Sequence, residues 1–357
     1  MKIQLNARNR AHHFDAAPAD KILYAGLSQA IGLPYECGSG TCGTCKARLL
    51  SGEIDDAWPE APGRKYLKHA DDFLMCQCSA RGDVSVEVAS FVEDFDPGVC
   101  VPAAVKGRIR NSQMLTHDVI DLHIDIDTPM DFDAGQFVLI RVPGIAGYRG
   151  WSMVNYERGA RSLQFVVKNK PGGKLSEWLF SPSPSPSQSP SQAQSRDGAE
   201  VELFGPLGSA TFYPSIAKNI LCIAGGSGIA GMMAILARAA GENYFAEHSG
   251  NVFFGVRSMK DAFYLDVLSR LRAQCGDKLQ VMVALSDGAA SAADQAAHPL
   301  LEFDTGFVHL AAERHMQGRY QGLRAYIAGP TPAVDASVRM LLMSRVSSDN
   351  IRYDKFS

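Results

Sequence analysis

Hydrophobic and polar positions alternate differently in three successive regions of the chain. The first region, up to about residue 92, has short alternating segments at 2–5 and 84–91, which predict strands. Between them, residues 21–34 place apolar side chains at helical spacing and end at Gly32 and Pro34. The first region is therefore predicted to be a small unit of mixed α and β structure.

The second region is rich in strand patterns. Its alternating or apolar runs, at 119–127, 135–142, 162–169 and 199–205, are separated by Gly, Pro and Asp turns. Such a series, with no long helical pattern between its members, predicts an antiparallel barrel or sandwich.

The third region alternates strands with helices. The strand-like runs lie at 219–226, 251–257, 279–286 and 323–329, and the helical patterns at 228–240, 266–274 and 332–345. This order predicts a mostly parallel sheet covered by helices. The expected units are 1–92, a linker at 93–102, 103–214 and 215–357, with a Ser/Pro-rich surface insertion at 181–195 whose simplest interpretation is neutral loop expansion.

Composition narrows the class of protein. The 357 residues are 46% hydrophobic and 20% charged, as in globular domains with real cores. A net charge of -3 gives no basic surface for nucleic acid. No apolar run reaches the ~18 residues of a membrane span, and the N-terminus lacks the apolar core of a secretory signal. We therefore expect a cytoplasmic protein that is a monomer or a weak oligomer.

Cysteine spacing carries the strongest chemical signal. Cys37, Cys42 and Cys45 form a C-x4-C-x2-C loop with three glycines, and a distant fourth cysteine would complete the plant-type pattern of a [2Fe-2S] cluster. Cys76 and Cys78 both follow at suitable distances, and spacing alone does not choose between them. Zinc is the alternative, but it prefers paired C-x2-C knuckles or Cys/His sets.

The segment around Cys76, "FLMCQC", resembles the L-x-C-Q segment of plant-type ferredoxins. This resemblance implies Cys76 as the fourth ligand beside Cys37, Cys42 and Cys45, and a β-grasp fold for residues 1–92. The acidic residues nearby, Glu36, Asp55 and Asp56, are candidates for steering a basic partner, with an ordinary solvated face as the simpler interpretation.

"YRGWSMVN" at 148–155 resembles the R-x-Y-S-x-x-N motif of the ferredoxin-NADP reductase superfamily. The resemblance implies an antiparallel β-barrel in which Arg149 neutralises the flavin pyrophosphate, Trp151 stacks on the isoalloxazine and Ser152 reaches N5 as a catalytic group. "PGGKLSEWLF" resembles the second phosphate segment of that superfamily, which implies phosphate contacts from Gly172, Gly173 and Ser176 and favours FAD over FMN.

The glycine turn at 225–228 resembles the motif that opens the Rossmann-like nucleotide domain of the same superfamily. The resemblance implies these cofactor-binding residues in the third region: Gly225, Gly226, Ser227, Gly228, Arg257, Gly329 and Pro330. Arg257 would suit the 2'-phosphate of NADPH, but Asp261 does not, so NADH is favoured. Ala328 stands where relatives carry a cysteine.

An aromatic residue near the C-terminus covers the flavin in many members of that superfamily. Phe356 is the first candidate for this catalytic position, Tyr353 is the second, and a frayed tail is the alternative.

Taken together, the three regions resemble the reductase components of bacterial aromatic-ring-hydroxylating oxygenases, of the benzoate dioxygenase reductase kind. The resemblance implies that NADH reduces FAD, that a [2Fe-2S] cluster takes single electrons from it, and that a terminal oxygenase receives them. A soluble di-iron monooxygenase or a sugar-deoxygenation enzyme as the partner remains an alternative. A non-catalytic, metal-stapled binding module is a remote one.

Overall fold

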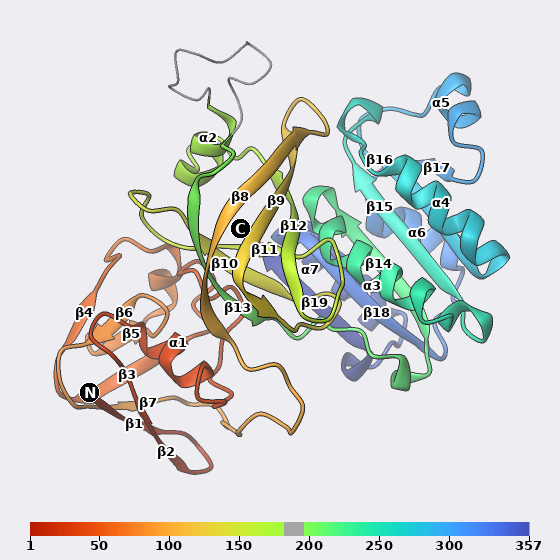
Figure 1. The fold of residues 1–357 in the computed structure, drawn as a ribbon. Helices are drawn as coiled ribbons and strands as arrows, with labels where there is room; N and C mark the ends of the chain where they lie inside the picture. The colour runs from red at the N-terminus through yellow and green to blue at the C-terminus, as the bar shows by residue number, and fades with distance from the viewer. Residues whose placement is uncertain (182–195, 357) are drawn as a thin grey trace, which may run out of the picture.

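The computed structural model describes residues 1–181 and 196–356, and it places three sheets in three successive regions of the chain (Figure 1). In Figure 1 the first unit lies at the lower left, the second in the middle and the third at the right. The second unit thus lies between the other two. The predicted insertion at 181–195 falls almost wholly outside the described residues.

The first unit is a five-stranded mixed sheet of order β2-β1-β7-β3-β5, with a separate β4-β6 pair. Its central strands β1 and β7 are parallel. Together with the short helix α1 they give the predicted β-grasp fold. The elements are β1 (Lys2–Asn6), β2 (Ala11–Asp15), α1 (Ile22–Leu27), β3 (Lys46–Ser51), β4 (Ile54–Asp56), the 3-10 turn η1 (Pro62–Tyr66), β5 (Asp72–Leu74), β6 (Cys78–Ala80) and β7 (Val84–Glu87).

The helix predicted over 21–34 is only six residues long, so its predicted end was wrong. Ala30 has a left-handed backbone (φ 60°), which stops helical hydrogen bonding. Leu33 then folds back against Gly26, where an added Cβ would lie 2.4 Å from Leu33 Cδ1. Burial of Leu33 against the helix therefore outweighs continued helix formation.

The second unit is a six-stranded antiparallel sheet of order β11-β10-β13-β8-β9-β12. A bridge between Met153 and Phe165 joins its two outer strands, and the Val154 N–H donates to the Gln164 carbonyl at 2.8 Å. This closure makes the predicted barrel. Its elements are β8 (Ala103–Met114), β9 (Val119–Met130), β10 (Phe137–Arg141), β11 (Arg149–Ser152), β12 (Ala160–Lys168), α2 (Lys174–Phe180) and β13 (Glu200–Leu207).

The third unit is a six-stranded, all-parallel sheet of order β17-β16-β15-β14-β18-β19, as the alternating pattern predicts. Helices α3 and α4 pack on one face, and α6 and α7 on the other. Its elements are β14 (Asn219–Gly225), α3 (Ile229–Gly241), β15 (Gly250–Val256), α4 (Leu265–Cys275), β16 (Leu279–Leu285), α5 (Ala292–Ala297), β17 (Glu302–Thr305), α6 (Val308–Met316), β18 (Leu323–Pro330), α7 (Thr331–Met343) and β19 (Ile351–Phe356).

The first unit and the barrel share a hydrophobic core. Tyr24 of α1 stacks on Phe204 of the barrel, with ring centroids 4.6 Å apart, and lies edge-on to Tyr148 at 5.5 Å. The Tyr35 hydroxyl accepts a hydrogen bond from the Gly208 N–H at 3.0 Å. These contacts hold the cysteine loop against the barrel.

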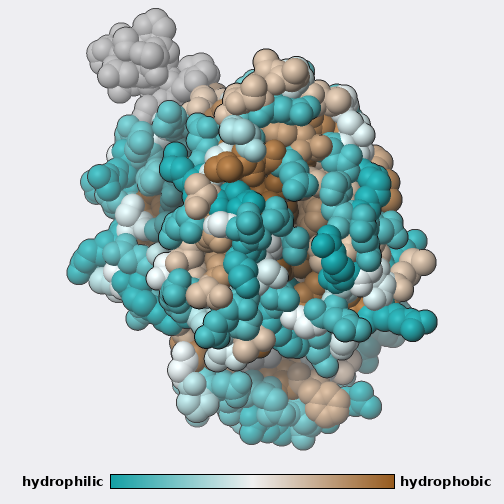
Figure 2. Space-filling view, turned by 90° about the vertical axis from the view of Figure 1, so that its right-hand side faces the viewer, coloured by the Kyte–Doolittle hydropathy of each residue, from teal (hydrophilic) through white to brown (hydrophobic). Residues whose placement is uncertain are grey.

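The surface on the side of the third unit is mostly hydrophilic, and its hydrophobic side chains are visible in small groups (Figure 2). Among the described helices, none has both the length and the apolar character that crossing a bilayer demands.

Candidate functional site

Three of the four candidate cluster ligands lie in the loop between α1 and β3, and the fourth precedes β6. Cys45 and Cys76 are each about 1% exposed, with their sulfur atoms 3.2 Å apart, whereas Cys42 is half-buried. The side-chain amide of Gln77 donates to Cys76 Sγ at 3.3 Å. The loop therefore has a buried side and a partly exposed side.

Backbone amides surround the sulfur atoms of this loop. The N–H groups of Ser39, Thr41 and Cys42 each donate to Cys37 Sγ at 3.4 Å. The Thr44 N–H donates to Cys42 Sγ at the same distance. Such donors stabilise negative charge on sulfur, as an anionic iron-sulfur cluster requires.

Glycine is required at two points of the loop. Gly40 has φ +92°, and a Cβ there would lie 2.9 Å from the Gln77 amide nitrogen. Gly43 has φ +78°, and its Cβ would lie 2.5 Å from Tyr66 Cδ2. Both the left-handed backbone and the lack of space exclude a larger residue.

The thiols differ in their protonation. A hydrogen bond from the Cys42 thiol, reinforced by backbone N–H groups, lowers the pKa of Cys37 to about 4 although burial opposes the shift. A shared hydrogen bond with Cys76, together with burial, raises the pKa of Cys45 well above its usual range. Sulfur atoms packed this closely become thiolates together only when metal supplies positive charge.

The sulfur spacing does not fit zinc. Four thiolates around one zinc lie ~3.8 Å from one another, given Zn–S bonds of about 2.3 Å in a tetrahedron. Among the described residues, no three of these cysteine sulfurs lie within 4.8 Å of one another. The sulfurs instead form two close pairs, Cys37 with Cys42 and Cys45 with Cys76, which fits the two metal ions of a binuclear cluster.

Cys78 has different surroundings from Cys76. It pairs with Asp56 across the β4-β6 ladder, and its side chain is fully buried. Burial is the main cause that raises the pKa of Cys78 to about 12. The Cys76 sulfur, in contrast, lies 3.2 Å from that of Cys45, which supports the prediction of Cys76 as the fourth ligand.

The acidic residues expected to steer a partner are largely neutralised. Asp55 accepts a hydrogen bond from Arg81 at 2.7 Å, and Asp56 is bound by Arg64. Glu36 accepts a hydrogen bond from the exposed Thr44 hydroxyl at 3.2 Å. Two of the three predicted steering charges are therefore balanced within their own unit.

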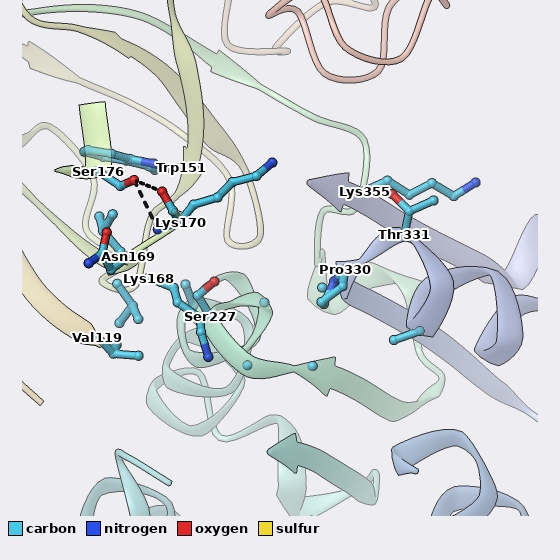
Figure 3. A pocket seen from close by; sticks show the side chains of 18 of the residues that line it. Val119, Trp151, Lys168, Asn169, Lys170, Ser176, Ser227, Pro330, Thr331 and Lys355 are labelled. Carbon is cyan, nitrogen blue, oxygen red and sulfur yellow. Dashed lines mark hydrogen bonds between the residues drawn. The ribbon is translucent and has the colours of Figure 1, made fainter. Parts of the chain in front are cut away.

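A cavity of about 1060 Å³ joins the three units. In Figure 3, Trp151, Lys170 and Ser176 lie on one side of this cavity, and Pro330, Thr331 and Lys355 on the other. The predicted flavin and nucleotide residues whose side chains the structure describes all line it, namely Arg149, Trp151, Ser152, Gly172, Gly173, Ser176, Gly225, Gly226, Ser227, Gly228, Arg257, Gly329 and Pro330. One cavity is thus lined by predicted flavin and nucleotide residues that are up to 181 positions apart in the sequence, from Arg149 to Pro330.

Arg149 begins β11 and is half-buried. Its guanidinium donates to the Tyr148 carbonyl at 2.8 Å, and it has no acidic partner among the described residues. Burial lowers the pKa of this arginine, because the positive charge loses hydration without gaining a counter-ion. The site therefore fits a phosphate group, which would supply the missing negative charge.

Trp151 and Ser152 follow Arg149 on the same strand. The Trp151 ring lies 6.1 Å from the Phe165 ring and faces the cavity beside it. Ser152 is buried, and its backbone pairs with Phe137. Both side chains line the cavity, so the end of this strand presents a flat ring and a hydroxyl to the same space, which suits a stacked isoalloxazine.

The second phosphate segment is a tight turn before α2. Gly172 has φ +75°. The Ser176 hydroxyl accepts a hydrogen bond from the Lys170 N–H and donates one to the Lys170 carbonyl, each at 3.1 Å (Figure 3). Ser176 therefore braces its own turn. Lys168 and Lys170, which the sequence reasoning did not select, also line the cavity and add positive charge there.

The nucleotide residues lie at the carboxyl ends of β14 and β18. Between these neighbouring strands the strand order reverses, and α/β sheets bind their ligands at such a point. Gly228 is confined there, because a Cβ would lie 2.4 Å from the Ala328 carbonyl oxygen. The missing side chain leaves the amides of the 225–228 turn open to a pyrophosphate.

Arg257 follows β15 and has two carboxylates beside it. Its guanidinium lies 3.5 Å from Asp261 and 3.9 Å from Asp118. Burial acts to raise the pKa of Asp261, but hydrogen bonds from Ser258 and the charge of Arg257 hold it below its usual value. Arg257 thus carries a charge that is already balanced.

Of the two aromatic candidates in the last strand, the structure describes the side chain of Tyr353 but only the backbone of Phe356. The backbone of Phe356 pairs with Pro330 at the edge of the sheet, but its side chain lies outside the described residues. Tyr353 is 37% exposed, and the Lys355 ammonium lies 4.9 Å from its ring. Lys355 itself lines the cavity.

Sequence reasoning missed several lining residues. Lys168 and Lys170 precede the Gly172–Gly173 turn, so a basic residue beside a glycine turn was an available signal. Trp58, Phe307 and Lys355 had no comparable signal, because they meet the cavity only through packing of the units.

Comparisons with known proteins agree with this geometry. Residues 5–81 match the 2Fe-2S iron-sulfur cluster binding domain, 106–188 the oxidoreductase FAD-binding domain and 222–339 the oxidoreductase NAD-binding domain. The chain is 32% identical to a ferredoxin–NAD(P)+ reductase of Metapseudomonas resinovorans, with 94% of each chain covered. It is 29% identical to the ferredoxin–NAD+ reductase component of an alkene monooxygenase system of Xanthobacter autotrophicus, over 98% of this chain and 99% of that one.

Among solved structures, the ferredoxin reductase in carbazole 1,9a-dioxygenase superposes with a TM-score of 0.80 at 31% identity, over 100% of this chain and 99% of that one. The likeness therefore extends over all three units and their order. The chain belongs to the family of ferredoxin–NAD(P)+ reductases that combine a 2Fe-2S domain, an FAD-binding domain and an NAD-binding domain.

Proposed function

We propose that this chain oxidises NADH and delivers electrons singly to a terminal oxygenase of the aromatic-ring-hydroxylating, Rieske non-haem iron kind. When bound, FAD accepts the electron pair of the nicotinamide, and the [2Fe-2S] cluster carries one electron at a time. The chain's own residues bind these groups, orient them and keep water from between them.

One observation carries the proposal: the cavity contains parts of all three candidate sites. Cys37 and Thr41 of the cluster loop, Trp151 of the barrel and Ser227 of the nucleotide turn line the same space. Neighbouring sites of this kind allow electrons to pass without release of a carrier. A metal-stapled binding module would have no need for such a cavity.

The proposal gives individual residues the following roles. Cys37, Cys42, Cys45 and Cys76 would hold the cluster. Arg149 would neutralise the pyrophosphate of FAD, with the turn at 172–176 beside it. Trp151 would stack on the flavin, Ser152 would donate a hydrogen bond to its reacting edge, and Phe356 would cover it.

The surroundings of Arg257 favour NADH over NADPH. A 2'-phosphate placed there would meet Asp118 and Asp261, whose carboxylates already balance the guanidinium. Like charges at such distances repel, and burial of Asp261 weakens solvent screening. A ribose hydroxyl brings no such penalty.

The partner class rests on the relatives. A structure related at 31% identity serves a dioxygenase, whereas another relative at 29% identity serves an alkene monooxygenase. We favour the ring-hydroxylating dioxygenase and retain the monooxygenase as a second candidate. We also expect the protein to be cytoplasmic and to act as a monomer or a weak oligomer.

Anaerobic titration of the purified holoprotein tests the function. NADH should bleach the flavin absorption and then the cluster absorption, and NADPH should do so with a much lower kcat/KM. Steady-state transfer to candidate oxygenases of both classes would identify the partner. A protein that binds flavin and cluster but leaves the cluster oxidised under excess NADH would contradict the proposal.

A further inference from the structure

Trp58 of the first unit belongs to no motif, yet it lines the cavity. It follows β4 and is half-buried, and its backbone is held firmly in place. Its N–H donates to Asp56 Oδ1 at 2.9 Å, and its carbonyl accepts from the Ala61 N–H at 3.1 Å. Because Arg64 in turn binds Asp56, these contacts anchor the Trp58 backbone to the η1 turn.

One side of the Trp58 indole contacts the cluster loop. A Cβ built on Gly40 would lie 3.2 Å from Trp58 Cε3, so the ring is in van der Waals contact with the loop backbone. The Gly40 carbonyl also accepts a hydrogen bond from the Gly63 N–H at 2.9 Å. The tryptophan and the η1 turn therefore contact the same stretch of the cluster loop.

The indole also faces the barrel. The guanidinium carbon of Arg149 lies 5.9 Å from the Trp58 ring centroid, within the range of a cation–π contact. Trp58 lines the cavity together with Cys37 on the cluster side and Trp151 on the flavin side. No single unit supplies this wall, because Trp58 comes from the first unit and Arg149 from the second.

We propose that Trp58 is a shared wall of the flavin and cluster sites, which closes the FAD cavity beside Arg149 and keeps packed protein between the flavin and the cluster loop. This inference rests on the proposed function. Each electron that leaves the flavin is gained by the cluster, and Trp58 is neither oxidised nor reduced. It is a positioning residue, whose ring excludes water from the gap across which the electron moves.

The test uses three variants at this position and one elsewhere. Trp58→Ala opens the wall, Trp58→Phe keeps a flat ring, and Trp58→Leu is too short to reach both Gly40 and Arg149. Phe91→Ala is the matched control, since Phe91 belongs to the same unit, its ring centroid lies 5.2 Å from the Arg8 guanidinium carbon, and it is absent from the described lining of the cavity.

Two quantities are measured for each variant and for the unmodified protein, the first of them on the holoprotein. Anaerobic stopped-flow absorption gives the rates of flavin and cluster reduction by NADH, and their ratio reports the transfer step. Fluorescence titration of the flavin-free protein gives the Kd for FAD without turnover. We expect Trp58→Ala to lower the ratio of cluster to flavin reduction by at least about tenfold, because small displacements between reacting groups cost that much. We also expect it to raise the Kd for FAD by up to about tenfold, the typical effect of one lost aromatic contact.

Trp58→Phe should keep both quantities near those of the unmodified protein, and Phe91→Ala should change neither. The inference is overturned if Trp58→Ala matches Phe91→Ala in both measurements. If Trp58→Ala loses its cluster during isolation, Trp58→Phe and Trp58→Leu are compared with each other instead. Equal ratios of cluster to flavin reduction in these two variants would overturn the inference. Failure of the proposed function is distinguishable from failure of this inference, because the cluster of the unmodified protein would then stay oxidised under NADH.

Discussion

The cluster loop and the cofactor cavity differ in how far apart along the chain their parts lie. Three of the four candidate cluster ligands fall within nine residues, and local glycine backbone shapes their loop. The cavity instead gathers turns of the barrel, the ends of parallel strands and side chains of the first unit. A site built locally is visible in a sequence, whereas a site built by packing of units is visible only in part.

The largest expected effect removes the cluster and leaves the cavity intact. Cys76→Ser takes away the sulfur that lies 3.2 Å from Cys45 Sγ. We expect complete loss of the visible cluster bands and of electron transfer to cytochrome c. NADH-dependent ferricyanide reduction should remain, because it needs only FAD. Absorption spectra and the two assays check this result.

Cys78→Ser is the control for that loss. Cys78 is equally buried but pairs with Asp56 across a strand ladder. Its variant should retain the cluster bands. The opposite outcome, with the cluster kept in Cys76→Ser and lost in Cys78→Ser, would show that the ligand assignment is wrong.

The converse experiment damages the cavity and spares the cluster. Arg149→Ala removes a half-buried charge that has no acidic partner among the described residues. We expect the Kd for FAD to rise about 10- to 100-fold, since hydrogen bonds to charged groups contribute about 1.5–3 kcal/mol. Flavin fluorescence titration gives the Kd, and the cluster bands should be unchanged.

Arg141→Ala supplies a matched control for Arg149→Ala. Arg141 lies on the neighbouring strand β10 and is bound by Glu202. Its loss should leave FAD affinity close to that of the unmodified protein. Similar flavin loss in both variants would mean that general damage to the barrel, and not a phosphate contact, explains the effect.

Much of the fold follows from the sequence, because each unit has its own hydrophobic period. The barrel and the parallel sheet were predicted correctly, whereas the helix at 21–34 was too long because Leu33 folds back on Gly26. In the site, the glycine turns in the sequence indicated the backbone parts of the cavity, and the cysteine spacing indicated the cluster loop. The position of Trp58 against Arg149 depends on how two units dock, which no local pattern encodes.

Asp354 lies in β19, is buried, and comes close to the barrel, where a Cβ built on Gly208 would lie 3.7 Å from Asp354 Oδ1. Burial, with a smaller contribution from Glu36 beside the cluster loop, raises the pKa of Asp354 to about 7 from an ordinary 3.8. The folded state therefore holds a proton that the unfolded state releases. Stability should fall as the pH rises from about 4 to about 7 and should then level off.

Asp354→Asn should remove this pH dependence. The gain in stability should be larger at pH 7.5 than at pH 5, by up to about 3 kcal/mol, because each unit of pKa difference contributes about 1.4 kcal/mol. Thermal unfolding of the holoprotein at both values checks this. Asp335→Asn, at a carboxylate that is 57% exposed and paired with Lys355, should show no such trend. An equal gain at both values would mean that Asp354 is ionised normally in the folded state.

The smallest effect concerns the far end of the cavity, where coenzyme selectivity is set by charge and not by a motif. Asp118 lies 3.9 Å from the Arg257 guanidinium and 3.1 Å from the Lys168 ammonium. Asp118→Asn leaves both cations less balanced, so a 2'-phosphate is repelled less. We expect the ratio of kcat/KM for NADPH to that for NADH to rise about three- to fivefold, in line with the roughly 1 kcal/mol of a partly exposed ion pair.

Asp125→Asn is the control for this selectivity change. Asp125 lies in β9, which Asp118 immediately precedes, and forms an exposed pair with Arg110 at 3.9 Å. It does not belong to the described lining of the cavity. Equal ratios in the two variants would place the 2'-position of the nucleotide away from Arg257. A rise confined to Asp118→Asn would show that the two carboxylates around Arg257 disfavour NADPH. It would also explain why the arginine alone was an ambiguous signal in the sequence, since its neighbour Asp118 comes from another unit, 139 positions earlier.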